Sequence, residues 1–211
     1  MEDRVDVLLE RQWDGLRSWL GEVDILRYRD RASGLGTWTL GDLVAHLGYG
    51  LRMLTEVTAA PTGETPMSLG RYVGAYPPAA PTIAQQTSGL AADLGADLLS
   101  GVDLIVAEAW RARRQISAPV VMGRRGPLTR NDYLLTRLLE LVVHGDDFHR
   151  ALPEIQVSPI VPDAAVAVAG ALSAAYEERS GHPPTSTTPP LSWIRHAAGR
   201  VSSPDPHLPL L

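Results

Sequence analysis

The sequence predicts a mainly α-helical protein built around a four-helix bundle. Four long segments, residues 2–27, 39–59, 83–113 and 128–152, have the apolar content of helices, and two of them begin with capping residues. Few stretches carry the signals of strands, and the connections are both short and long. Four helices connected in this way are typical of a bundle whose metal and ligand sites form between facing helices.

The first two predicted helices are separated by a glycine-containing loop at residues 31–38. In residues 2–27, apolar side chains recur at spacings of three and four, and charged residues occupy much of the remaining surface. The second helix starts at Thr39, and Asp42 completes the pattern of a capping box. Gly48 and Gly50 weaken this helix locally and allow a neighbouring helix to approach closely.

The middle of the chain contains an irregular link followed by a third helical region. Five prolines among residues 61–81 predict a loop. Residues 83–113 are rich in Ala and Leu but are interrupted by Gly89, Gly95 and Gly101, each of which costs up to about 1 kcal/mol relative to alanine in a helix. Residues 116–127 are expected to form an extended turn.

The helix predicted at residues 128–152 organises the rest of the chain. Thr129 and Asp132 have the spacing of a capping box, and Pro153 stops the helix. Its leucines and valines point in nearly every direction around the axis, which indicates a helix buried on all sides. One polar line interrupts them: Arg137, Glu140 and Asp147 fall within roughly 60° of His144 at about 100° per residue. Buried polar groups need partners, so a metal or a network of salt bridges is expected here.

After Pro153 the character of the sequence changes, and we predict a bundle domain over residues 1–152 with an extension over residues 153–211. An alanine-rich helix is expected from Pro162 to about Arg179. The remainder is proline-rich, with a short helical candidate at residues 193–198. No internal repeat of the kind found in solenoids is present.

The composition excludes several classes of function. The net charge of -5 and the lack of a basic run argue against nucleic acid or an anionic membrane as the main partner. No apolar run approaches the roughly 18 to 20 residues that span a bilayer, and the acidic, amphipathic N-terminus is unlike a signal peptide. We therefore expect a cytoplasmic protein, with a homodimer as an open possibility.

The chain contains neither cysteine nor lysine, and its nineteen basic residues are all arginine. The protein therefore offers no thiolate nucleophile, no sulfur ligand for zinc and no lysine for a Schiff base. Any metal site must use His, Asp or Glu.

The candidate metal ligands are His46, Glu140 and His144. Glu140 and His144 lie four apart on one helix face, and His46 lies on another predicted helix that the bundle can bring opposite them. Two histidines and one carboxylate leave positions open for water or substrate, as in catalytic sites. The alternative is structural: Glu140 pairs with Arg137, His144 hydrogen-bonds to Asp147, and His46 is satisfied by Asp42 near the helix start. Spacing alone leaves both interpretations open.

Two segments resemble a known family. TWTLGDLVAHL (37–47) and LTRLLELVVHGDDF (135–148) are similar to the mycothiol-dependent maleylpyruvate isomerase metal-binding domain, a member of the DinB-like metalloprotein group. The resemblance covers roughly residues 5–152. It implies a DinB-like four-helix bundle that holds a divalent metal, usually zinc, through His46, Glu140 and His144. Asp147 matches the acidic residue that follows the last histidine in the family pattern.

The end of the chain shows a looser resemblance. PPLSWIRHAAGR and the terminal HLPLL are similar to fragments of the sterol-carrier-like region that follows this domain in relatives. Here that region is short, with little room for a sheet, which argues against a lipid-carrier role.

Together these observations lead to a hypothesis of a metalloenzyme that uses an external thiol such as mycothiol to isomerise a small electrophile or to transfer sulfur to it. Arg137 is expected to contact Glu140 or a substrate carboxylate, and Asp147 to orient a ligand histidine. The alternatives are a metal-water hydrolase on the same ligands and a non-catalytic bundle that binds a metal or a small ligand.

Overall fold

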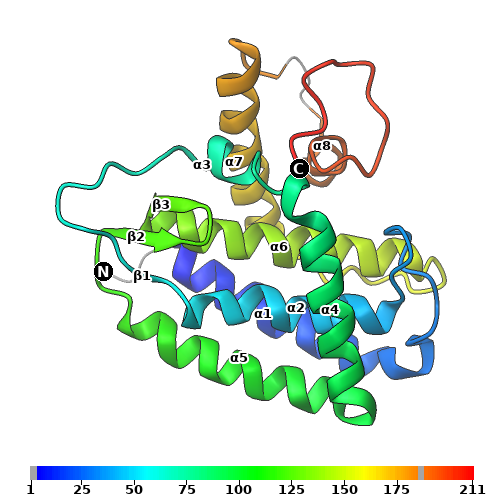
Figure 1. Cartoon of the computed structure of the whole chain (residues 1–211). Coiled ribbons are helices and arrows are strands. Elements are labelled where there is room, and N and C mark those ends of the chain that lie inside the picture. The colour runs from blue at the N-terminus through cyan, green and yellow to red at the C-terminus, as the bar shows by residue number, and fades with distance from the viewer. Residues whose placement is uncertain (1–3, 185–187) are drawn as a thin grey trace.

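The computed structural model describes residues 4–184 and 188–211 and confirms a mainly α-helical bundle. The bundle is formed by four long helices, shown in Figure 1: α1 (Arg4–Glu22), α2 (Leu40–Arg52), α5 (Leu98–Gln115) and α6 (Arg130–Ala151). Helix α6 packs against α1 and α2, and α2 packs against α5. The core between them consists of leucine, valine and tryptophan side chains, among them Trp13 and Trp19 of α1.

Helix α6 confirms the prediction for residues 128–152. Thr129 is its N-cap, and its hydroxyl accepts a hydrogen bond from the Asp132 amide. Leu134, Leu138 and Val142 have no exposed surface. Because helices cover α6 on several sides, its apolar residues point in many directions and are still buried.

Helices α1 and α2 are shorter than the predicted segments. Helix α1 ends at Glu22 and is followed by a 3-10 turn, Ile25–Tyr28, while the predicted start at residues 2 and 3 lies outside the described residues. Helix α2 begins with the predicted capping box of Thr39 and Asp42. A Cβ atom placed on Gly48 would lie 3.1 Å from the Val102 side chain, which confirms the predicted close approach of a neighbouring helix, whereas a Cβ atom placed on Gly50 would have open space around it.

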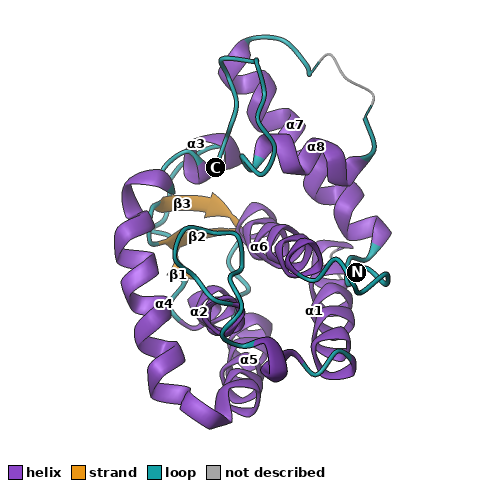
Figure 2. Ribbon diagram, turned by 90° about the vertical axis from the view of Figure 1, so that its right-hand side faces the viewer, coloured by secondary structure: helices purple, strands orange, loops and turns teal. Residues whose placement is uncertain are grey.

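Residues 83–113, predicted as a helical region interrupted by glycines, are divided at one of these glycines. The chain forms two helices, α4 (Ala80–Leu94) and α5, separated by a 3-10 turn at Gly95–Asp97. Gly95 has φ 53° and ψ -119°, a conformation that a residue with a side chain rarely adopts. Only α5 belongs to the bundle, and α4 lies on the outer side of α2 (Figure 2).

We predict that Gly95→Ala destabilises the protein by about 1–3 kcal/mol, because alanine cannot adopt this backbone conformation without strain. Gly89→Ala is the matched control: Gly89 is an exposed residue inside α4 with open space at its Cβ position. Alanine at Gly89 should stabilise the protein by about 0.5–1 kcal/mol. Urea unfolding of the two variants measures both effects, and equal effects of the same sign would contradict the role of Gly95.

A small antiparallel sheet lies at one end of the bundle. The expected turn at residues 116–127 is a hairpin of β2 (Val120–Gly123) and β3 (Gly126–Thr129), and β1 (Thr58–Ala59) pairs with β2. The predicted loop at residues 61–81 is largely irregular but includes the short helix α3 (Leu69–Val73) and a 3-10 turn at Pro77–Ala79.

The C-terminal extension is helical. Helix α7 (Pro162–Ser180) closely matches the predicted helix and packs against α1, α3 and α6. The short helical candidate is α8 (Pro190–Ala197), which packs on α7. The described part of residues 153–211 contains no strand. The division of the chain at residue 152 stays a prediction.

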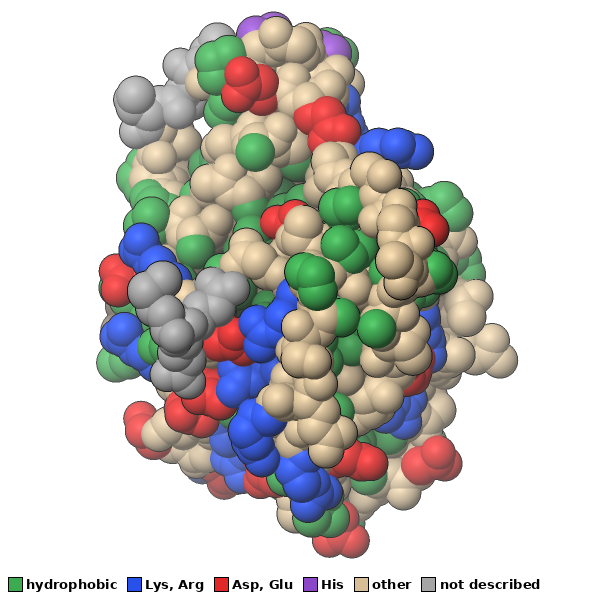
Figure 3. All heavy atoms as spheres, turned by 90° about the vertical axis from the view of Figure 1, so that its left-hand side faces the viewer, with side chains coloured by type: hydrophobic (Ala, Val, Ile, Leu, Met, Phe, Trp, Pro, Cys, Tyr) green, Lys and Arg blue, Asp and Glu red, His purple; other side chains and the backbone are tan. Residues whose placement is uncertain are grey.

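Charged side chains pair across the helices. Asp6 of α1 accepts hydrogen bonds from Arg113 and Arg130, and Asp146 of α6 binds Arg195 of α8 with two hydrogen bonds. Figure 3 shows a band of arginine side chains with acidic side chains beside it on the face near the N-terminus. Among the described helices, none is long and apolar enough to cross a membrane.

Candidate metal centre

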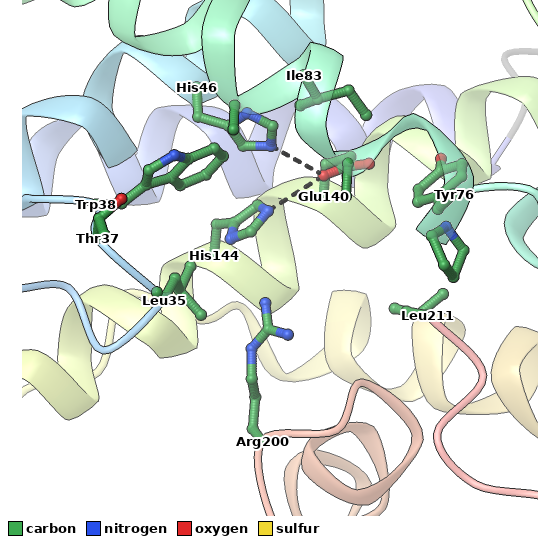
Figure 4. Close-up of a pocket in the computed structure, with 14 residues that line it drawn as sticks. Leu35, Thr37, Trp38, His46, Tyr76, Ile83, Glu140, His144, Arg200 and Leu211 are labelled. Carbon is green, nitrogen blue, oxygen red and sulfur yellow. Dashed lines mark ion pairs between the residues drawn. The ribbon is translucent and has the colours of Figure 1, made fainter.

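Helices α2 and α6 bring together the three predicted metal ligands. The ligand atoms of His46, Glu140 and His144 all lie within 4.8 Å of one another. One carboxylate oxygen, Oε2 of Glu140, is 3.5 Å from Nε2 of His46 and 3.3 Å from Nε2 of His144. The two imidazole rings meet edge to face, with centroids 4.7 Å apart. All three side chains therefore converge on one point, as Figure 4 shows.

Each histidine is held through the nitrogen that faces away from Glu140. Nδ1 of His46 is 3.1 Å from the hydroxyl of Thr87, a fully buried residue of α4. Nδ1 of His144 is 2.9 Å from Oδ2 of Asp147, one turn further along α6. Arg200, from the loop after α8, donates two hydrogen bonds to the same carboxylate. These contacts fix both rings so that Nε2 points at Glu140 and is the atom that a metal would bind.

The electrostatics of the site are those of a carboxylate between two imidazoles. Burial opposes ionisation of Glu140, but hydrogen bonds from His144 and His46 hold its pKa well below the usual value. Burial lowers the pKa of His46. Burial also acts against protonation of His144, yet its bonds to Asp147 and Glu140 raise its pKa to about 9. Without a metal, the charge of Glu140 is therefore balanced by a protonated His144.

A cavity of about 600 Å³ opens beside the three ligands. Apolar side chains of the 31–38 loop and of α4 form much of its wall, including Leu35, Trp38 and Ile83. The ring centroids of Trp38 and His46 lie 4.8 Å apart. Arg200 and Leu211 border the cavity on the side of the C-terminal extension (Figure 4). A small organic molecule in this cavity would contact the ligand atoms directly.

Comparison with known families places this site in context. The family model of the mycothiol maleylpyruvate isomerase N-terminal domain matches residues 9–149, more than half of the chain. The chain belongs to this family. No curated protein and no solved structure matches the chain significantly. The match to the model of the mycothiol maleylpyruvate isomerase N-terminal domain ends at residue 149, before α7. It therefore does not test the resemblance of the C-terminal extension to a sterol-carrier-like region.

The residues of this family domain fit a divalent metal. Once His144 has lost its Nε2 proton, two imidazole nitrogens and one carboxylate are donors suited to zinc and to several other divalent ions. Asp147 and Thr87 supply the supporting hydrogen bonds that metal-bound histidines usually have. Oε2 of Glu140 lies within 3.5 Å of both Nε2 atoms. A cation placed among these three atoms would therefore be close to all three donors.

The structural alternative for these residues is partly right. His144 does hydrogen-bond to Asp147, but through Nδ1, which leaves Nε2 directed at Glu140. Asp42 caps α2 and does not bond to His46. No ion pair between Glu140 and Arg137 forms within the described residues; Arg137 instead donates to the Gly50 carbonyl and the Tyr76 hydroxyl.

Three residues at or beside the candidate metal site were not identified from the sequence. Thr87 lies on a helix that was predicted as part of a longer one, and Arg200 lies in the proline-rich tail. Trp38 lies in the cavity wall beside His46. Local spacing could not place Thr87 or Arg200, because their partners are 41 and 53 residues away.

Proposed function

We propose that the protein is a metal-dependent enzyme that uses an external low-molecular-weight thiol, of the mycothiol type, to isomerise a small electrophile or to transfer sulfur to it. One observation carries the proposal: in a chain of the mycothiol maleylpyruvate isomerase family, His46, Glu140 and His144 converge at the wall of an open, largely apolar cavity. The protein has no cysteine, so the reacting thiol must come from outside.

In this proposal His46 and His144 would hold a divalent metal, zinc in the first instance, through Nε2, and Glu140 would hold it through its carboxylate. The metal supplies a positive charge that lowers the pKa of an incoming thiol and holds it as the thiolate at neutral pH. A ligand set of two histidines and one carboxylate would leave room for the sulfur of the thiol to join as a further ligand. Asp147 keeps Nδ1 of His144 protonated and so directs its Nε2 toward the site.

The cavity then determines what reacts. Leu35, Trp38 and Ile83 reduce the access of water to the ligand atoms, which favours attack by the thiol over hydrolysis. The thiolate adds to a carbon–carbon double bond that is conjugated to a carbonyl group: the C–S bond forms as the π bond opens, and its electron pair moves onto the carbonyl as an enolate. If the enolate collapses after rotation about the resulting single bond, the double bond re-forms, the thiolate leaves and the product is an isomer. If the enolate takes up a proton instead, the C–S bond persists and the product is a thioether.

Turnover that depends on the thiol is the direct test of this function. The purified, metal-loaded protein is incubated with a panel of electrophiles, including a cis-enoyl acid, with and without mycothiol. We expect turnover only when the thiol is present, and its loss in His144→Ala. Equal hydrolysis with and without thiol would replace the proposal with a metal-water hydrolase.

Metal binding should release a proton. His144 has a pKa of about 9, so its Nε2 carries a proton at pH 7 that the metal must displace, whereas the pKa of His46 and Glu140 is lowered. The apparent affinity should rise about tenfold per pH unit from pH 7 toward 9 and then level off. Titration calorimetry in buffers of different ionisation enthalpy measures the proton count, and a count of zero at pH 7 would contradict the assignment.

A further inference from the structure

A second, smaller cavity lies beside the candidate metal centre. Its volume is about 170 Å³, and it shares His46, Ile83 and Glu140 with the main cavity. The rest of its wall includes three arginines that do not border the main cavity: Arg124 and Arg125 from the β2–β3 hairpin, and Arg137 of α6. It is therefore an arginine-rich recess that reaches two of the three ligands, His46 and Glu140.

Arg137 is a buried cation that forms no direct ion pair; the carboxylate of Glu140, on the same wall, attracts it only from beyond ion-pair distance. Only 4% of its surface is exposed, and its guanidinium donates to the neutral oxygens of Thr136, Gly50 and Tyr76. Within the described residues, no carboxylate forms an ion pair with it. Keeping an unpaired charge away from water costs several kcal/mol, so a site for an anion beside Arg137 would offset a real cost.

Arg125 is a second unpaired cation at the same recess. Its guanidinium carbon lies 4.2 Å from the ring centroid of Tyr76, the same tyrosine whose hydroxyl accepts from Arg137. Its Nε is buried without a hydrogen-bond partner, and no acidic side chain in the described part of the chain pairs with it. Arg125 and Arg137 thus approach Tyr76 from two elements and both face the recess.

Arg124 differs from these two residues. Its guanidinium donates to both carboxylate oxygens of Glu56 and to the Tyr49 hydroxyl, so its charge is already balanced. Among the described residues that line the recess, Arg125 and Arg137 are therefore the two cations without a direct ion pair, and Glu140 is the acidic residue on the same wall.

We propose that this recess binds the carboxylate of a small acidic substrate between Arg125 and Arg137. A volume of about 170 Å³ accepts a carboxylate with a few neighbouring atoms but no larger molecule. Guanidinium groups bind carboxylates with short, charge-assisted hydrogen bonds. A carboxylate bound there places the adjoining carbon beside Glu140 and His46, and leaves the main cavity for the thiol. That the bound acid is also the electrophile attacked by the thiol rests on the proposed function.

Binding of malonate tests the recess without any turnover. Calorimetry on the full chain measures the dissociation constant of malonate, with malonamide as the uncharged comparison. In Arg125→Met we expect malonate affinity to fall by about 10–100-fold, the scale for loss of one charge-assisted hydrogen bond. Arg52→Met is the matched control, because Arg52 lies near Tyr49 at the end of α2 but does not line the recess. It should reduce the affinity by less than about threefold, the effect of a distant surface charge.

The outcomes separate the recess from the proposed function. Repeating the titration with the metal removed distinguishes an arginine site from direct binding to the metal, since only the former keeps its dependence on Arg125. Equal effects of Arg125→Met and Arg52→Met, equal binding of malonamide, or no binding of malonate overturns the proposal. If malonate binds as expected but no thiol-dependent turnover is found, the recess stands and the proposed function fails.

Discussion

Glu140→Gln should abolish tight metal binding. The substitution keeps the shape of the side chain but removes the only carboxylate among the three ligands, and with it the charge that faces both Nε2 atoms. We expect a loss of affinity larger than the about 10–100-fold that follows when a partner outside the coordination sphere is removed. Equilibrium dialysis against zinc, followed by elemental analysis, gives the metal content per chain.

Glu10→Gln is the matched control for this variant. Glu10 also pairs with a basic side chain, Arg113, but it lies on α1 away from the ligands. Loss of the Glu10 charge should leave the metal content unchanged. A metal content of Glu140→Gln equal to that of the unaltered protein would remove the three-residue site. The metal-free form of Glu140→Gln should also show a lower pKa for His144, because one of the two carboxylates that raise it is gone.

Asp147→Asn should weaken metal binding by about 10–100-fold and destabilise the fold. The affinity falls because the hydrogen bond of His144 Nδ1 to a charged oxygen is replaced by one to a neutral amide. The stability falls because Arg200 loses the carboxylate that accepts two of its hydrogen bonds. Removal of one partner of a buried pair costs about 3–5 kcal/mol, and the partial exposure of Arg200 makes about 2–3 kcal/mol the expected loss.

The chain supplies a close control in the preceding residue. Asp146 is equally buried and binds Arg195 with two hydrogen bonds, but it does not contact either histidine. Asp146→Asn should therefore destabilise the protein to a similar extent and leave the metal affinity unchanged. If both variants lose metal affinity equally, the effect comes from general destabilisation, and the role of Asp147 as a positioning residue is refuted. Urea unfolding and a chelator competition give the two quantities.

Helix α6 was predictable because its signals are local. Thr129 and Asp132 mark its start, Pro153 lies just beyond its end, and the i, i+4 spacing of Glu140 and His144 follows from one helix face. The convergence of His46 on the same point was suggested by the family resemblance, and the bundle geometry brings it about.

The parts that could not be predicted depend on long-range packing. Three glycines interrupt residues 83–113, and nothing local shows that only Gly95 takes a positive φ. The turn there lets α4 fold back over α2 and bring Thr87 to His46. Arg200 reaches Asp147 only because α7 folds back on α6 and α8 packs on α7, which no motif in the proline-rich tail indicates.

Cobalt spectroscopy with an added thiol tests the central claim most directly. Cobalt(II) is loaded in place of zinc, and absorption is recorded before and after addition of mycothiol. An external thiolate at the open coordination position should produce a new sulfur-to-cobalt charge-transfer band in the near ultraviolet, with a matching change in the visible bands. The band should be absent in Glu140→Gln. A cobalt-loaded protein whose spectrum does not change with thiol would contradict the proposed thiol-dependent metal site.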